Sequence, residues 1–260
     1  MLAPEEFLHI ITEIIPQLKE CARLVITSES PNSTEKGANP YDLLTSYDIE
    51  LEERIITILS HATPGVAIVG EESGGDMNRE EFWLVDPIDG TLHFTRHMPF
   101  CMTMVALIQN GYPVISVLIN LYTGDVYHAV KGAGAYMNNQ KIEVSKRHDR
   151  SSLVLVESSL ARHQDILAFQ RVHKSYKTMN LCCAGYEFCL VASGKVEARV
   201  VYNGYGKAYD FASGALLVNE AGGVVRNFHD EEFSILDTDF LAASNETLYY
   251  HLKSLIEGRE

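Results

Sequence analysis

Two carboxylates stand three residues apart within residues 83–91, which read W-L-V-D-P-I-D-G-T. Asp86 and Asp89 follow an apolar run at 82–85 that predicts a buried strand. Pro87 lies between them and stiffens the tight turn that we expect there. An isolated D-x-x-D is more often an ordinary acidic turn than a site. Paired carboxylates at the end of a buried strand are nevertheless suited to hold a divalent cation.

The two residues that follow are suited to a phosphate beside such a cation. Gly90 lets the backbone approach a ligand closely, and Thr91 suits the N-cap of a following helix. Backbone N–H groups at the start of a helix have no partner within the helix and attract anions. The stretch therefore predicts a site for a cation and a phosphate.

Other acidic residues support this interpretation. Glu71 stands in G-E-E-S, directly after a predicted strand at 66–69, and Asp210 stands in Y-D-F-A-S-G at the start of a predicted helix. We predict that Glu71, Asp86, Asp89 and Asp210 share one site. Hard oxygen ligands with few cysteine or histidine neighbours favour magnesium over zinc. Carboxylates this close repel one another, so a fold that keeps them together implies bound cations.

The overall charge narrows the class of partner. The chain has 260 residues, a formal net charge of −14 and a pI near 5.1. A nucleic-acid surface or an anionic membrane would require a basic patch, so neither is an expected partner. The same charge would repel a phosphorylated small molecule, unless bound cations neutralise it where the substrate enters.

The cysteines and the N-terminus predict a cytoplasmic protein. There are five cysteines, an odd number, and Cys182 and Cys183 are adjacent, which indicates reduced thiols. The N-terminus, M-L-A-P-E-E, is acidic where a signal peptide would be basic. The longest apolar run, 114–121, is too short to cross a bilayer.

The first part of the chain predicts two helices followed by a meander of strands. Helical periodicity covers 5–29, where Pro16 should kink or split the helix, and a second helix runs to Leu59 with Thr45 or Ser46 as its cap. A loop or loose hairpin is expected at 30–41. Apolar runs predict strands at 66–69, 82–85, 102–109, 114–121 and 125–130, the last three as an antiparallel meander.

From about residue 150, strands and helices alternate. We expect strands at 153–156, 196–201 and 240–243, and helices at 164–173, 185–193, 209–221 and 245–256. This half predicts α/β layers. A charged stretch at 146–151 predicts a boundary between an N-terminal half, 1–147, that carries most of the acids, and a C-terminal half, 148–260, that carries Asp210.

Several motifs together resemble the inositol monophosphatase family of magnesium-dependent, lithium-sensitive phosphatases. They include D-L-L-T-S-Y-D, G-E-E-S, W-L-V-D-P-I-D-G-T, A-V-K-G-A-G-A-Y-M-N-N, C-L-V-A-S-G, and Y-D-F-A-S-G with E-A-G-G-V-V behind it. The resemblance runs nearly end to end, and D-P-I-D-G-T is very specific. It implies an α/β fold, an α-β-α-β-α layered sandwich, in a protein that forms a homodimer.

The resemblance also assigns metal ligands, residue by residue. It implies that Glu71, Asp86 and the backbone carbonyl of Ile88 bind a first Mg²⁺, and that Asp86, Asp89 and Asp210 bind a second. Glu71 would also touch a third, loosely held ion, giving two to three ions per site. Mn²⁺ is expected to substitute for Mg²⁺, whereas Li⁺ or Ca²⁺ is expected to inhibit.

The same resemblance assigns the catalytic residues. By local sequence alone, Asp48 would only favour the dipole of its helix. The family pattern instead pairs it with Thr91 as the dyad that positions the attacking water, with Glu71 as the third catalytic residue. Gly90 and Thr91 would meet the phosphate, and Asp89 and Asp210 would also contact the substrate.

The substrate end departs from the family pattern. Cys182, Cys183 and Ala184 stand where the family has a Gly-Ser-Ala or Gly-Thr-Ala turn, and Asn203 stands where inositol-preferring members have a glutamate. These four residues form the predicted substrate wall. Each also has a structural interpretation: the cysteines as small core residues, and Asn203 as part of a turn. Lys207 is either a surface charge or a contact for a second anionic group.

The predicted function is Mg²⁺-dependent hydrolysis of a phosphomonoester by a metal-activated water. The expected substrate is myo-inositol monophosphate or a similar polyol or sugar phosphate. Lys207 and the missing glutamate leave two alternatives open, a 3′-phosphorylated nucleotide such as 3′-phosphoadenosine 5′-phosphate, and fructose 1,6-bisphosphate. A regulatory or binding protein on the same fold would require a damaged metal site, whereas every ligand position here is intact.

Overall fold

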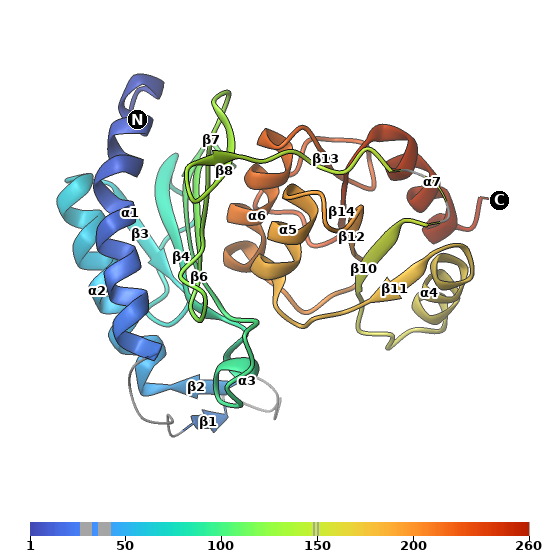
Figure 1. Cartoon of the computed structure of the whole chain (residues 1–260), viewed down its shortest axis with the longest axis horizontal. Coiled ribbons are helices and arrows are strands. Elements are labelled where there is room, and N and C mark those ends of the chain that lie inside the picture. Colours follow the sequence, from blue (N-terminus) through green and yellow to red (C-terminus); the bar gives the residue numbers. More distant parts are fainter. Residues whose placement is uncertain (27–32, 36–42, 148, 150, 260) are drawn as a thin grey trace.

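The computed structural model describes residues 1–26, 33–35, 43–147, 149 and 151–259. Five layers follow one another across the molecule in Figure 1, a helix pair, a sheet, a second helix pair, a second sheet and a third helix pair. This is the α-β-α-β-α sandwich expected from the sequence, and the predicted fold class is confirmed.

The first layer consists of α1 (Pro4–Ile26) and α2 (Ser46–Ala62). The apolar face of α1 packs on the first sheet, as its helical periodicity predicted. The expectation that Pro16 might split this helix was wrong, because α1 continues through it. Pro16 and Thr12 are both exposed, so water can reach the Thr12 carbonyl that Pro16 leaves without its usual donor.

The first sheet has seven strands in the order β3-β4-β5-β6-β7-β8-β9. Their bounds are β3 (Ala67–Gly70), β4 (Glu81–Asp89), β5 (Met102–Gln109), β6 (Tyr112–Asn120), β7 (Val126–Val130), β8 (Gly134–Met137) and β9 (Gln140–Lys141). β3 and β4 are parallel, and every later pair is antiparallel. The predicted meander is confirmed, whereas the β8–β9 hairpin was not predicted.

Both faces of this sheet are buried, which explains its nearly continuous apolar strands. Trp83 and Val85 face the core that α1 and α2 share with the sheet, whereas Phe82 and Leu84 lie on the opposite face. That opposite face packs against the middle helix layer, formed by α5 (Ala184–Ala192) and α6 (Ala208–Glu220).

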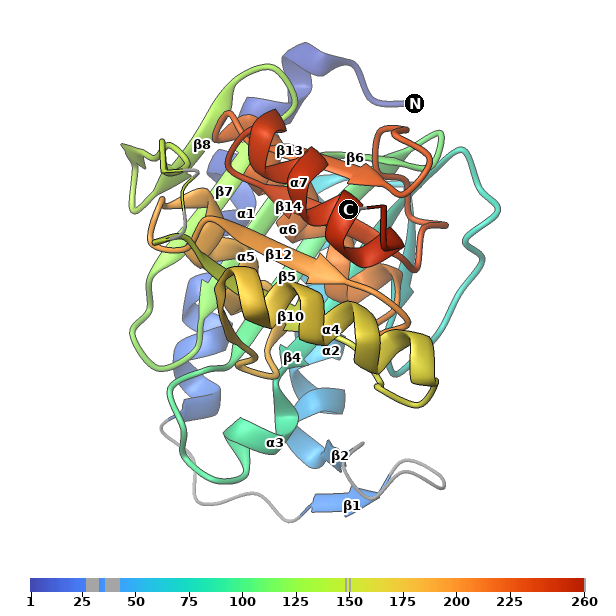
Figure 2. The same ribbon diagram turned by 90° about the vertical axis from the view of Figure 1, so that its right-hand side faces the viewer.

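The second sheet has five strands in the order β11-β10-β12-β14-β13 and lies on the other side of α5 and α6. Its strands are β10 (Leu153–Glu157), β11 (Lys177–Met179), β12 (Ala198–Val201), β13 (Val224–Asn227) and β14 (Phe240–Ala243). Helices α4 (His163–Ser175) and α7 (Glu246–Glu257) cover its outer face, which is turned toward the viewer in Figure 2. The short strands β11 and β13 were not predicted.

Two small elements complete the fold at one end. β1 (Ser33–Glu35) pairs antiparallel with β2 (Leu43–Thr45), and α3 is the single turn Thr91–Phe94. The rest of the loop or hairpin predicted at 30–41, and residues 27–29 of the first predicted helix, lie outside the described residues. No helix in the described part of the chain combines the length and apolarity needed to cross a membrane.

The two sheets fall on opposite sides of the boundary predicted at 147/148. Helices α5 and α6 belong to the C-terminal half by sequence, yet they pack against the first sheet as well as the second. The division into two halves therefore stays a prediction about organisation. The shared helix layer matters more for function, because both of its helices begin beside the acidic residues.

Candidate metal and phosphate site

The two acids of the central motif lie in the last part of β4. Asp86 pairs with Met104 and Asp89 pairs with Met102, so β4 has one more residue than β5 between these two pairs. The tight turn expected here was wrong: the strand continues to Asp89 through a β-bulge. Pro87 can occupy a bulge because it has no N–H to donate to the ladder. The bulge lies at the C-terminal end of β4, so both carboxylates are at that end of the strand.

The start of α5 holds Asp89. The backbone N–H of Ala184 donates to Asp89 Oδ1 at 3.2 Å, and the N–H of Gly185 donates to Oδ2 at 2.6 Å. The Cys183 thiol donates to Oδ2 at 3.0 Å. A carboxylate at a helix N-terminus is favoured both by these donors and by the helix dipole. One residue of the first sheet is thus tied to the middle helix layer.

Asp210 comes from the other middle helix. It lies in the first turn of α6, where its Oδ2 accepts the backbone N–H of Lys207 at 2.5 Å. Carboxylate oxygens of Asp86, Asp89 and Asp210 all lie within 4.8 Å of one another. Residues more than 120 positions apart in the sequence therefore meet in one cluster, as predicted.

Glu71 reaches the same place through the parallel pair β3–β4. Gly70 at the end of β3 lies opposite Val85, and the Glu71 N–H donates to the Val85 carbonyl at 3.0 Å. Its carboxylate lies close enough to Asp86 to raise the pKa of that residue. All four predicted acids are thus neighbours, although their roles as ligands remain predictions.

The electrostatics of the cluster disfavour negative charge. Burial raises the pKa of Asp86 well above its ordinary value, and the charges of Glu71, Asp89 and Asp210 raise it further. Burial also raises the pKa of Asp89, to about 6, although the donors at the start of α5 counteract this effect. Loss of solvent and the charge of Asp89 raise the pKa of Asp210. At an effective dielectric of 20, each pair of charges 4.8 Å apart costs about 3–4 kcal/mol.

The carboxylate cluster fits a divalent cation. Both carboxylate oxygens of Asp86 are buried, and apart from the neighbouring Glu71 carboxyl no group in the described part of the chain donates a hydrogen bond to them. A buried carboxylate without a donor is costly unless a cation neutralises it. Oxygen atoms from three carboxylates at this spacing are the ligands that Mg²⁺ and Ca²⁺ prefer.

The predicted dyad lies next to the cluster. Thr91 Oγ1 is 3.4 Å from Asp48 Oδ1 and 3.0 Å from the Ile88 carbonyl oxygen. Asp48 is fully buried, and its other oxygen accepts both the N–H and the hydroxyl of Thr45, at 2.7 and 2.6 Å. Thr45 Oγ1 also accepts the backbone N–H groups of Tyr47 and Asp48, which confirms Thr45 as the cap of α2, and Asp48 is fixed in orientation.

Gly90, not Thr91, is the N-cap of the short helix that follows β4, which corrects the expected cap. Its φ of 86° lies in the left-handed region, and a Cβ there would stand 2.6 Å from the Phe100 carbonyl oxygen. Only glycine meets both requirements without strain. The chain can therefore turn sharply between Asp89 and Thr91, which keeps the hydroxyl of Thr91 near the carboxylates.

The predicted substrate wall is brought only partly to the cluster. Cys183 and Ala184 contact Asp89 directly, while Cys182 is exposed and has a left-handed φ of 52°. Asn203 is turned elsewhere: its Nδ2 donates to Ser159 Oγ at 2.6 Å and to Asp165 Oδ2 at 2.8 Å. Both amide hydrogens are thus used within the chain, so only Oδ1 of Asn203 could meet a substrate hydroxyl.

Two residues that shape the site were not predicted. Glu52 of α2 is buried, and its two oxygens accept the N–H groups of Glu72 and Ser73 at 3.0 and 2.8 Å, which fixes the turn after β3. Its position one helical turn after Asp48 was an available signal. Arg199, a charged residue inside an apolar strand, is the second, and its partners are described below.

The α-β-α-β-α layers and the carboxylate cluster between the first sheet and the middle helix layer define a candidate metal-dependent protein. Residues 4–258 match the model of the inositol monophosphatase family. The inositol-1-monophosphatase of Bacillus subtilis is 29% identical over 237 residues, which cover 88% of each chain. The Nus factor SuhB of Xylella fastidiosa is 30% identical over 207 residues, covering 75% of this chain and 73% of that protein.

A solved structure has the same fold. The extragenic suppressor protein SuhB of Bartonella henselae superimposes with a TM-score of 0.86 at 23% identity, covering 96% of this chain and 98% of that one. This chain belongs to the inositol monophosphatase family.

Replacing Asp86 by Asn should stabilise the metal-free protein. At pH 7.5 we expect the free energy of unfolding to rise by about 1–3 kcal/mol, because one charge leaves a repulsive buried cluster. The pKa of Asp86 is raised in the folded state, so the wild-type chain regains that stability as the pH falls toward 3.8. Urea unfolding at pH 7.5 and pH 4 should therefore show a difference that disappears at the lower pH.

Asp125→Asn is the matched control for this variant. Asp125 accepts hydrogen bonds from Thr123 and Asn138, both at 2.7 Å, and the bond from Thr123 is the largest cause of its lowered pKa. Its replacement should leave stability unchanged or reduce it. A destabilised Asp86→Asn protein at pH 7.5 without metal would contradict the repulsion described above.

Proposed function

We propose that this protein is a Mg²⁺-dependent phosphomonoesterase. The observation that carries the proposal is the buried carboxylate of Asp86, which among the described residues has only the Glu71 carboxyl as a hydrogen-bond partner and lies in a cluster with Asp89 and Asp210, beside the Thr91–Asp48 pair. A cluster of this kind without a cation would only destabilise the fold. The hydroxyl next to it gives the site a group that can orient water.

Five groups are proposed to hold the metal, and they come from the ends of β3 and β4 and the start of α6. They are the carboxylates of Glu71, Asp86, Asp89 and Asp210 and the backbone carbonyl of Ile88. Bound Mg²⁺ would supply a water of lowered pKa and positive charge opposite the substrate oxygens. We infer two to three ions per site from the family resemblance, with Mn²⁺ able to substitute and Li⁺ or Ca²⁺ inhibitory.

Thr91 and Asp48 are proposed to orient the attacking water. The Thr91 hydroxyl can donate to Asp48 and accept a hydrogen bond from water with its own oxygen. The hydroxyl also lies 3.0 Å from the Ile88 carbonyl oxygen, and donation to either acceptor, this carbonyl or the Asp48 carboxylate that Thr45 fixes, leaves the Thr91 oxygen to accept from the water. In the reaction, the water oxygen bonds to phosphorus in line as the phosphorus–ester oxygen bond breaks. One proton of the water is transferred, overall, to the departing alkoxide.

The phosphate is proposed to lie against the first turn of α3. Gly90 and Thr91 begin this turn, where N–H groups lack acceptors within the helix. Asp89 and Asp210 would face the substrate from the other side, together with the substrate wall. The proposed substrate is myo-inositol monophosphate or a similar polyol or sugar phosphate, as in the relatives named inositol monophosphatase.

Three further parts of the proposal come from the sequence: a homodimer from the family resemblance, a cytoplasmic location from the odd number of cysteines, and the division at 147/148 from the charged stretch at 146–151. A non-enzymatic role is the alternative from another class, since one relative is named a Nus factor. The complete set of acidic residues in the cluster favours an enzyme, because a binding protein on this fold would not need to keep a repulsive cluster intact.

The substrate class can be tested by phosphate release with Mg²⁺. We expect myo-inositol 1-phosphate to be hydrolysed with a higher kcat/KM than 3′-phosphoadenosine 5′-phosphate or fructose 1,6-bisphosphate. The substrate wall offers Asn203 Oδ1 as an acceptor for a substrate hydroxyl. Lys207, the residue considered for a second anionic group, instead has its Nζ 5.5 Å from the centre of the Tyr209 ring. A preference for either bisphosphate would contradict the assigned substrate class and make Lys207 the first residue to replace.

Thr91→Ala should reduce kcat by about 10²–10⁴-fold with little change in KM, because the hydroxyl acts on the water and not on substrate binding. Thr95→Ala is the matched control. Thr95 ends the same short helix, and its hydroxyl donates only to the Leu92 carbonyl, at 3.0 Å, among the described residues. Steady-state kinetics should show the fall in kcat for Thr91→Ala and not for Thr95→Ala. Equal activity of the two variants would contradict the proposed role of Thr91.

A further inference from the structure

Arg199 is a charged side chain buried inside the protein. It lies on β12, is 1% exposed, and its guanidinium carbon is 4.7 Å from the ring centre of Phe188 and 5.4 Å from that of Phe211. Arginine stays protonated at any physiological pH, so its burial requires negatively charged partners and favourable geometry.

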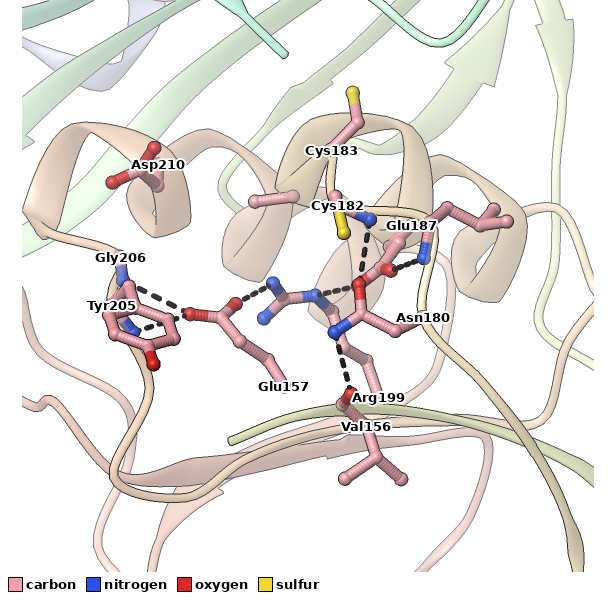
Figure 3. A network of polar contacts seen from close by, with 12 residues as sticks. Val156, Glu157, Asn180, Cys182, Cys183, Glu187, Arg199, Tyr205, Gly206 and Asp210 are labelled. Carbon is pink, nitrogen blue, oxygen red and sulfur yellow. Dashed lines mark hydrogen bonds and ion pairs between the residues drawn. The ribbon is translucent and has the colours of Figure 1, made fainter. Parts of the chain in front are cut away.

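Two glutamates supply that charge. Nε of Arg199 donates to Oε2 of Glu187 at 2.8 Å, and Nη2 donates to Oε2 of Glu157. Figure 3 shows the guanidinium between the two carboxylates. Nη1 has no hydrogen-bond partner among the described residues. We refer to Glu157, Arg199 and Glu187 as the buried triad; with two carboxylates and one guanidinium, it carries a net charge of −1 and is unsuited to bind an anion itself.

The second oxygen of each glutamate holds a loop. Oε1 of Glu157 accepts the N–H groups of Tyr205 and Gly206, both at 3.0 Å. Oε1 of Glu187 accepts the N–H of Leu181 at 2.6 Å. One guanidinium thus orients two carboxylates, and through them it holds one N–H group in residues 180–183 and two in residues 203–207, the latter two at Tyr205 and Gly206 (Figure 3).

Both loops lead directly into the candidate site. Residues 180–183 contain Cys182 and Cys183 and run into the start of α5, whose N–H groups hold Asp89. Residues 203–207 contain Asn203 and run into α6, which carries Asp210 in its first turn. The buried triad therefore connects the two loops that contain the predicted substrate wall, of which one leads to the residues that hold Asp89 and the other to Asp210.

The loop at 203–207 packs closely against Glu157 of the triad and against the Phe211 ring, which lies beside Arg199. A Cβ on Gly204 would stand 2.5 Å from Oε1 of Glu157, and a Cβ on Gly206 would stand 2.2 Å from the Phe211 ring. Real Cβ contacts of this length do not occur, so only glycine allows the loop to approach this closely. A shift of Glu157 would displace the loop.

We propose that Arg199 is a positioning residue for the substrate wall. Acting through Glu157 and Glu187, it fixes residues 180–183 and 203–207 and thereby sets how the leaving group of the ester fits. Arg199 is buried below the wall and does not itself touch the substrate. This inference rests on the proposed function for its kinetic consequence, whereas its structural part can be measured without any activity.

Arg199→Lys is the informative variant, because lysine keeps the positive charge between the glutamates but cannot bond both with a planar fork. Arg199→Met is a second variant that also removes the charge. Arg226→Met is the matched control. Arg226 lies in the same sheet, donates to Glu246 at 2.9 Å and to the Tyr250 hydroxyl at 3.4 Å, and lies 5.8 Å from the Tyr249 ring centre; none of these partners lies in the two loops.

Hydrogen–deuterium exchange gives the readout that needs no substrate. In Arg199→Lys, amides of residues 180–183 and 203–207 should exchange about tenfold faster, while peptides covering 84–91 should be unchanged. Arg226→Met should leave both loops as in the wild type. Unchanged exchange in both loops of Arg199→Lys and Arg199→Met would overturn the proposal.

Kinetics give the second readout. For myo-inositol 1-phosphate, Arg199→Lys should lower kcat/KM by about 10–100-fold, mainly through a higher KM, because a misplaced wall weakens the fit of the leaving group. Inorganic phosphate has no leaving group and should inhibit variant and wild type equally. A fall in kcat alone, with KM and exchange unchanged, would mean that Arg199 only stabilises the core.

The two proposals fail in different ways. If the wild-type protein releases no phosphate from any ester, the proposed function fails, and the exchange data alone decide whether Arg199 fixes the loops. If the wild type is active but Arg199→Lys matches it in KM and exchange, only the positioning role fails.

Discussion

Repulsion among buried carboxylates is the constraint on which the rest of this structure depends. Oxygens of Asp86, Asp89 and Asp210 lie within 4.8 Å of one another, in a chain with a formal net charge of −14. The fold offsets this repulsion unevenly. Three donors at the start of α5 reach Asp89, and one at the start of α6 reaches Asp210, whereas Asp86 receives none from a backbone or hydroxyl group of the described residues. The proposed cation site is therefore next to Asp86.

The middle helix layer supplies the donors that offset this repulsion at Asp89 and Asp210. α5 and α6 lie between the two sheets (Figure 1), and each begins at the cluster, so both helix dipoles present their positive ends to the carboxylates. Because the loops of the predicted substrate wall lead into the same two helices, the proposed metal site and the proposed substrate wall are built from connected parts. The buried triad lies below both helix starts and links them through Glu187 on α5 and Glu157 on β10.

The sequence was most informative where local pattern decides structure. Buried strands bounded by Gly-containing turns and helices with apolar periodicity lie where expected, and acids at strand ends and at the start of a helix do meet, as the four-carboxylate hypothesis required. The short strands β11 and β13 were not predicted, because three or four residues are too few to show the alternation of a strand. The β-bulge at Pro87 was interpreted as a turn because both place proline where no N–H is needed.

Features that depend on distant partners could not be read from the sequence. Glu157 is 42 residues from Arg199, so nothing in the local sequence indicates that they pair across β10 and β12. The orientation of Asn203 depends on Asp165, 38 residues away. Such contacts arise only when strands and helices pack. They shape the predicted substrate wall, where the sequence also departs from its family.

The measurement that tests the central claim most directly is phosphate release from myo-inositol 1-phosphate against Mg²⁺ concentration, for the wild type and for Asp89→Asn. The account predicts activity that is absent with EDTA, rises with Mg²⁺ in the wild type, and is lost by orders of magnitude in the folded variant. Wild-type hydrolysis that persists with EDTA, or an Asp89→Asn enzyme as active as the wild type, would contradict a catalytic metal site in this carboxylate cluster.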